Sequence, residues 1–150
     1  MELKDKDLVS VQEARNLLEQ AKAAQEELAR MDQQQIDRIV KAISEAGIAH
    51  ATQLAKAAQE ETGFGIWQDK VIKNLFASKI VYEAVKDQKT IGILHEDKER
   101  KIWDIGVPVG VIAGIIPSTN PTSTVIYKAM IALKGGNAIS TYPIQLFSKN

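Results

Sequence analysis

The segment Pro117–Pro121 (PSTNP) carries the residues of this sequence best suited to stabilise a negative charge. An apolar run rich in Val and Ile precedes it and a helical pattern follows it, so a strand gives way to a helix there. Ligands gather beyond the carboxyl ends of strands in open α/β sheets, and a helix N-terminus offers backbone donors. The segment therefore suits a phosphate or an oxyanion, to which Asn120 adds two amide donors. A purely structural turn is the alternative, because Pro, Ser, Thr and Asn are common turn residues.

Several other chemistries are excluded or disfavoured. The 150 residues contain no cysteine, which removes disulfides, cysteine–zinc sites and thiol nucleophiles from this stretch of chain. His50 and His95 have no second histidine at ligand spacing, so no metal site is expected. Gly110 and Gly114 lie before or within the predicted strand rather than in its turn, so the dinucleotide fingerprint G-x-G-x-x-G is missing.

The overall composition is that of an ordinary soluble domain. Lys and Arg number 19, as do Asp and Glu, and this balance predicts no nucleic-acid or membrane partner. The longest apolar run, Val107–Ile116, is too short to span a bilayer, and the first ten residues lack the apolar stretch of a signal peptide. We therefore expect a cytoplasmic protein.

Residues 1–89 show the periodicity of helices. The Ser10 and Glu13 spacing predicts a capping box at the start of the first helix, and Asp32 with Gln35 predicts another. Gly47 is expected to end the second helix. Behind Ser10, apolar residues at helical period are expected to face inward: Val11, Ala14, Leu17, Leu18, Ala21, Ala24 and Leu28. Two further helices are expected from about 49 to 61 and from 67 to 85.

Residues 90–150 have the pattern of an α/β fold. Strands are expected at Thr90–Leu94, Lys101–Val107 and Val109–Ile116, the last buried on both faces of a parallel sheet. A helix at Thr122–Leu133, a glycine stop and a strand from Ala138 would complete the first half of a βαβ unit.

Four segments in order resemble the coenzyme-A-acylating aldehyde dehydrogenases. They are EETGFG (60–65), DKVIKN (69–74), VPVGVIAGIIPSTNPTST (107–124) and IYKAMIALKGGNAI (126–139). This family includes the aldehyde half of bifunctional aldehyde–alcohol dehydrogenases and the aldehyde enzymes of bacterial microcompartments. The hydrolytic aldehyde dehydrogenases have a bulky tryptophan before the asparagine, and this sequence does not, which favours the acylating branch.

The resemblance implies a function and a set of site residues. In the family a cysteine thiolate attacks an aldehyde, hydride passes to NAD or NADP, and the acyl group is transferred to coenzyme A. By motif position, Asn120 would be the oxyanion-hole amide. Ile116, Pro117, Ser118 and Thr119 would line the cofactor cleft, and Lys101–Val107 would begin a region of subunit association. The fold implied is helices in residues 1–89 followed by the start of a Rossmann-like cofactor domain in 90–150.

Two features depart from the family pattern. The family chain is several-fold longer, and its catalytic domain, which carries the nucleophilic cysteine, is absent from these 150 residues. The tail Ser140–Asn150 lacks the Pro-His-Pro turn that follows the second strand in the family. We therefore expect a partial, frameshifted or otherwise truncated gene product that is inactive alone, and the nucleotide sequence would decide between these origins.

A different class of function stays open at this point. The chain would then be a non-catalytic helical interaction module that associates with itself or with a longer homologue, docking through Lys101–Val107. Localisation would be cytoplasmic in either case, with a microcompartment as the more specific family possibility.

Overall fold

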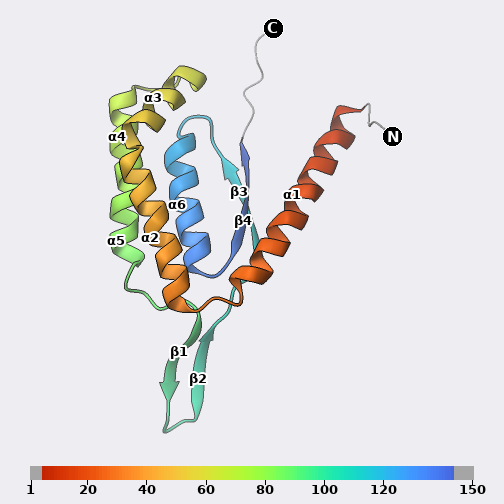
Figure 1. Ribbon diagram of the computed structural model, residues 1–150, viewed down its shortest axis with the longest axis vertical. Helices are drawn as coiled ribbons and strands as arrows, with labels where there is room; N and C mark the ends of the chain where they lie inside the picture. The colour runs from red at the N-terminus through yellow and green to blue at the C-terminus, as the bar shows by residue number, and fades with distance from the viewer. Residues whose placement is uncertain (1–4, 144–150) are drawn as a thin grey trace.

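The computed structural model describes residues 5–143 and combines a helical layer with two small sheets (Figure 1). In chain order the elements are α1 (Lys6–Leu28), α2 (Gln33–Ala49), α3 (Ala51–Thr62), α4 (Trp67–Leu75), η1 (Phe76–Ile80), α5 (Val81–Val85), β1 (Gly92–Asp97), β2 (Ile102–Gly106), β3 (Val111–Ile116), α6 (Pro121–Lys134) and β4 (Ala138–Pro143). The expected α/β fold, with helices before the strands, is confirmed.

The helix boundaries agree with the sequence where local hydrogen bonds set them. The predicted capping box at α2 is present: Asp32 Oδ1 accepts from the Gln35 amide at 2.8 Å, and Gln35 Oε1 accepts from the Asp32 amide at 2.9 Å. The prediction for Ser10 is wrong, because α1 begins about a turn earlier, at Lys6 with Asp5 as its N-cap, and the Ser10 hydroxyl donates to the Lys6 carbonyl inside the helix.

Gly47 does not end α2, contrary to expectation. The helix continues to Ala49, and Gly47 is buried where α2 crosses η1. A Cβ atom at Gly47 would lie 2.7 Å from the Cβ of Ser78. The glycine is therefore explained by close packing between two helical segments rather than by a helix stop.

The segments α4, η1 and α5 form one continuous helical run from Trp67 to Val85, as predicted. Its middle, Phe76–Ile80, adopts π-helical geometry, in which a hydrogen-bonded turn holds one residue more than an α-helical turn. The Ser78 hydroxyl donates to the Asn74 carbonyl in this turn at 2.7 Å, and the Ser78 carbonyl accepts from the Ser44 hydroxyl of α2 at 2.9 Å. The π turn is thus anchored to the helix beside it.

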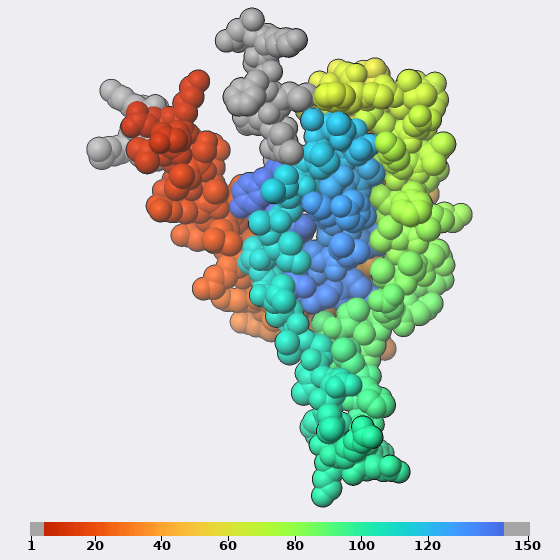
Figure 2. Space-filling view, turned by 180° about the vertical axis from the view of Figure 1, so that it is seen from behind, coloured from red at the N-terminus to blue at the C-terminus, as the bar shows by residue number. Residues whose placement is uncertain are grey.

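The strands form two separate pairs. β3 and β4 are parallel, with Val111 opposite Ala138, and α6 connects them as the expected βαβ crossover. β1 and β2 form an antiparallel hairpin that projects from the body of the molecule (Figure 2).

The core lies between α2, the α4–α5 run and α6. Its buried members include Ile36 and Val40 of α2, Ala77 of η1, and Ile126 and Met130 of α6. Burial of these apolar side chains provides the main stabilisation of the helical layer. From this layer, α6 packs against the β3–β4 pair.

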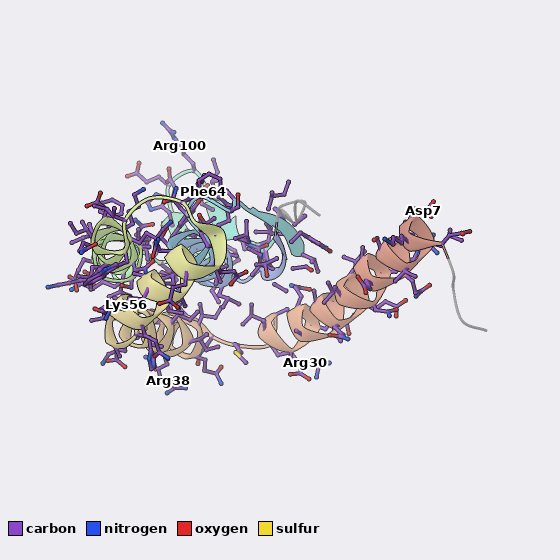
Figure 3. The ribbon with its side chains drawn as sticks, turned by 90° about the horizontal axis from the view of Figure 1, so that it is seen from above. Asp7, Arg30, Arg38, Lys56, Phe64 and Arg100 are labelled. Atoms are coloured by element: carbon purple, nitrogen blue, oxygen red, sulfur yellow. The ribbon has the colours of Figure 1, made fainter. Side chains whose placement is uncertain are left out.

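The other face of β3 and most of α1 are exposed, which corrects two expectations. Ile115 is 59% exposed, so β3 is not buried on both faces, and Leu18 of α1 is 51% exposed. The α1 helix contacts the two strands near its C-terminal end and then extends away from the body (Figures 1 and 3). Most of the apolar stripe of α1 therefore lacks a partner among residues 5–143, and in α1 only Leu28 is fully buried.

Candidate functional site

The turn between β3 and α6 holds Asn120 at the first position before the helix. The Asn120 backbone carbonyl accepts from the Thr124 amide and hydroxyl, at 3.3 and 2.6 Å, and Pro121 occupies the first helical position. The Asn120 side chain makes no capping bond to the helix backbone. Its carboxamide is therefore not committed to the ordinary N-cap role that such a residue often has.

Three polar side chains of α4 reach this turn. Lys70 Nζ donates to the Thr119 carbonyl at 2.7 Å, and Lys73 Nζ donates to Asn120 Oδ1 at 2.8 Å. The Thr122 hydroxyl donates to Asn74 Oδ1 at 2.8 Å. Lys73 and Asn74 follow Lys70 by three and four residues, and both spacings place a side chain on the same side of the helix as Lys70.

Asn74 links three helices. It is 1% exposed, and its Nδ2 donates to the Ala51 carbonyl of α3 at 3.0 Å while its Oδ1 accepts from Thr122 of α6. Buried amide groups are costly unless they are hydrogen-bonded, and both ends of this amide are. The start of α6, and with it the turn, is therefore fixed relative to α4 and α3.

The site has a positive electrostatic character. Lys70 is only 5% exposed, and its burial, together with the neighbouring Lys73 charge, lowers the pKa of Lys70 below its ordinary value of 10.5. Two ammonium groups and the N-terminus of α6 thus face the same turn. This arrangement favours a partial or full negative charge in the space beside Asn120.

Two cavities adjoin Asn120, and Lys73 lines both. The larger has a volume of about 560 Å³ and is mostly apolar, with Ile72, Phe76 and Tyr127 in its wall. The smaller has a volume of about 220 Å³ and lies between the Phe64–Ile66 segment, α4 and the turn. Asn120 therefore stands between an apolar space and a more polar one.

The residues expected to line a cofactor cleft occupy the turn but do not all face these cavities. Ile116 is buried at the end of β3, Pro117 and Ser118 are half-buried, and Thr119 is exposed. Thr119 lines the smaller cavity, whereas the walls of both cavities lack Ile116, Pro117 and Ser118. A ligand that contacts the latter three would approach the turn from another side.

Sequence reasoning missed Lys70, Lys73 and Asn74. A signal was present, since these polar residues recur at helical spacing within a segment that also contains an apolar stripe. What the spacing could not show is which other segment this polar face meets. Most of the tail Ser140–Asn150, which departs from the family pattern, lies outside the described residues, since these end at 143.

Within residues 5–143, His, Asp and Glu side chains form no cluster of three suited to hold a metal ion. No helix in the same range has both the length and the apolar composition needed to cross a bilayer.

Comparison with known proteins identifies the family. The pattern of the aldehyde dehydrogenase family matches residues 3–145, so the chain belongs to that family. The homologues within it are acetylating enzymes and their relatives. The chain is 47% identical over 136 residues to the bifunctional aldehyde-alcohol dehydrogenase AdhE of Escherichia coli (strain K12), which covers 91% of this chain and 15% of that protein. It is 41% identical over 135 residues to the succinate-semialdehyde dehydrogenase (acetylating) of Clostridium kluyveri, covering 90% of this chain and 29% of that one.

Solved structures agree with the sequence matches. A probable aldehyde dehydrogenase from Listeria monocytogenes EGD-e superposes with a TM-score of 0.92 at 64% identity, covering 94% of this chain and 31% of that structure. More distant neighbours, at 27% identity, include a Rhodopseudomonas palustris propionaldehyde dehydrogenase with bound propionyl-CoA and an engineered glycolyl-CoA reductase with bound NADP+. The chain therefore spans less than a third of the length of these relatives. The comparisons favour the enzyme family over the helical interaction module.

Proposed function

We propose that this chain supplies part of the cofactor- and aldehyde-binding region of a coenzyme-A-acylating aldehyde dehydrogenase. The overall reaction would convert an aldehyde, coenzyme A and NAD(P)+ into acyl-CoA, NAD(P)H and a proton. The observation that carries this proposal is the Asn120 carboxamide, which is held beside a largely apolar cavity of about 560 Å³ without serving as a helix cap.

The proposed role of Asn120 is to stabilise the oxyanion formed when the aldehyde carbonyl is attacked. An amide donor aimed at developing negative charge acts most strongly in a site that excludes water. The Nδ2 group has only a long contact, 3.4 Å, to the Thr119 hydroxyl, so it can donate to a substrate oxygen. The neighbouring lysine charges and the α6 N-terminus would favour the same negative charge.

The nicotinamide cofactor is proposed to lie against the turn formed by Ile116, Pro117, Ser118 and Thr119. The donor set fits such a group, since the Ser118 and Thr119 hydroxyls are at least partly accessible and can hydrogen-bond a ribose or amide. When bound, NAD or NADP would accept the hydride from the substrate. Coenzyme A and a small aldehyde are the co-substrates proposed from the relatives.

These 150 residues are proposed to be inactive alone. Thioester formation needs a sulfur nucleophile, and the sequence contains no cysteine. We further propose the cytoplasm as the location, with a microcompartment as the more specific possibility suggested by the family.

Two measurements test the proposal. Titration of the isolated chain with NADH and with NADPH, followed by fluorescence, should show saturable binding of at least one of them. A chimaera that joins residues 5–143 of this chain to the remaining segments of the Listeria relative should show an aldehyde- and coenzyme-A-dependent rise in absorbance at 340 nm.

The same chimaera isolates the role of Asn120. Asn120→Ala should lower kcat by about 10²–10³-fold, the cost typical of removing one oxyanion donor. An unchanged kcat in this variant would contradict the oxyanion role, and a 340 nm rise from the isolated chain would contradict its inactivity.

A further inference from the structure

We infer that Lys73 is a positioning residue, which sets the orientation and the donor strength of the Asn120 carboxamide. The inference rests on the proposed function, because it assigns to Lys73 an effect exerted through Asn120. The observation behind it is the 2.8 Å hydrogen bond from Lys73 Nζ to Asn120 Oδ1.

The chemistry of the ammonium group determines which way the amide points. An ammonium group carries three donors and no acceptor, so only the oxygen of a carboxamide can face it. With Oδ1 held toward α4, the Nδ2 group, which lies in the same plane on the other side of Cγ, must point away from the Lys73 ammonium group. Without Lys73 the two orientations of the amide, related by a half-turn about its last side-chain bond, would differ much less in energy.

The hydrogen bond from Lys73 is the stronger of the two contacts that the Asn120 carboxamide makes within the described part of the chain. The other is the long 3.4 Å contact between Nδ2 and the Thr119 hydroxyl. Charge-assisted hydrogen bonds are shorter and stronger than neutral ones. A positive charge at Oδ1 also polarises the amide, which makes the Nδ2 protons better donors to an oxyanion.

The surrounding contacts keep Lys73 in place. Lys70 and Asn74, on either side of it along α4, are bonded to the Thr119 carbonyl and the Thr122 hydroxyl. The helix and the turn are therefore held at a fixed separation, which the Lys73 side chain bridges.

The test uses Lys73→Met, which keeps the length of the side chain and removes its charge and donors. In the chimaera defined above we expect kcat to fall about tenfold, with little change in KM for the aldehyde. Lys73→Arg, which retains donors and charge, should restore most of the loss. Lys79→Met, at an exposed lysine of the same helical run, is the matched control and should leave kcat unchanged.

A second measurement reads the amide directly in the isolated chain. The Asn120 side-chain signal in a ¹H–¹⁵N spectrum is assigned from its loss in Asn120→Ala. Lys73→Met should shift this signal and speed its hydrogen exchange, while Lys79→Met should do neither. Circular dichroism of each variant confirms that the helices are retained.

The outcomes separate the two proposals. If Asn120→Ala lowers kcat but Lys73→Met changes neither kcat nor the amide signal, the positioning role is overturned and the proposed function stands. If Asn120→Ala has no effect on kcat, the oxyanion role fails and this inference fails with it. A loss of kcat in Lys73→Met with an unchanged amide signal and no restoration by arginine would also overturn the inference.

Discussion

Substitution of Gly47 by alanine should destabilise the protein, although glycine-to-alanine changes inside helices ordinarily stabilise them. Alanine is favoured over glycine in a helix interior by about 1 kcal/mol. At this position, however, the new methyl group would lie 2.7 Å from Ser78 Cβ and 3.4 Å from Ile126 Cγ2. Both contacts are to atoms held by buried helices, so backbone segments must move apart.

The expected magnitude follows from two opposing terms. Overpacking a well-packed interior costs about 1–3 kcal/mol, and the helix-propensity gain offsets about 1 kcal/mol of it. We expect a net loss of up to about 2 kcal/mol in the free energy of unfolding, or a fall in Tm of up to about 8 °C for a chain of this size. Gly47→Val should cost more, because it adds two methyl groups and a β-branched side chain to the helix.

Thermal and urea unfolding followed by circular dichroism measure these differences. Ala46→Gly, at the exposed neighbouring position of α2, measures the local propensity difference without the packing contact. Ser78→Gly removes the opposing Cβ but also the Ser78 hydroxyl bond to the Asn74 carbonyl, so it is measured alone as well. In the double-mutant cycle, Gly47→Ala should cost less in the Ser78→Gly background than in the wild type. If Gly47→Ala stabilises the protein by as much as Ala46→Gly destabilises it, the packing argument is wrong.

Three further substitutions test the contacts that hold the site and the core together. Asn74→Ala should lower the free energy of unfolding by about 2–3 kcal/mol, since it removes hydrogen bonds to Ala51 and Thr122 and leaves a cavity; urea unfolding measures it. Lys134→Met should cost about 1–2 kcal/mol by the same assay, because the buried ammonium loses its bonds to the Asp37 carboxylate and a backbone carbonyl while Asp37 itself keeps partial access to water. Lys70 has a lowered pKa, so as the pH rises toward 10.5 the folded state loses the Lys70 proton before the unfolded state does. The stability of the wild type should therefore rise relative to that of Lys70→Met over this alkaline range, as measured by urea unfolding at a series of pH values.

Exposed residues on the same helices provide the controls. Gln68→Ala on α4 and Lys41→Met on α2 should each change stability by less than about 0.5 kcal/mol. Equal effects of Asn74→Ala and Gln68→Ala would show that the buried amide does not tie the helices together. A Lys70→Met difference that stays constant with pH, or reverses its slope, would show that Lys70 keeps its ordinary titration.

Local signals in the sequence predicted the elements whose boundaries depend on local chemistry. The α2 capping box needs only Asp32 and Gln35, three residues apart, so their spacing was sufficient. In the same way, Gly135 follows the last residue of α6 as the predicted glycine stop, while the helix begins one residue before the predicted Thr122, because Pro121 suits the first helical position. The turn that carries Asn120 was predicted for the same reason.

The features that sequence reasoning missed depend on contacts between distant segments. Gly47 has the residue type of a helix stop, and only its proximity to Ser78, 31 positions later, explains why a glycine stands inside the helix. Likewise, Lys73 and Asn120 are separated by 47 positions, so neither pattern indicated the other. The apolar side of α1 was predicted to face inward, but most of it is exposed. Helical periodicity predicts that a helix has an apolar face, and it does not predict whether residues 5–143 contain a surface that packs against that face.

The π turn has a geometric consequence for the helical run that contains it. Lys70, Asn74, Ser78 and Tyr82 follow one another at intervals of four residues, whereas an α-helix completes a turn in 3.6. In an unbroken α-helix, such a series would wind gradually around the axis and leave the side it started on. The π-helical turn at Phe76–Ile80 holds one residue more than an α-helical turn, and this extra residue compensates for most of the rotation that the four-residue spacing would cause. The first half of the run can therefore face the β3–α6 turn while Tyr82 still packs against the core. Deleting a single residue there would rotate one half against the other and separate the two tasks that this helix performs.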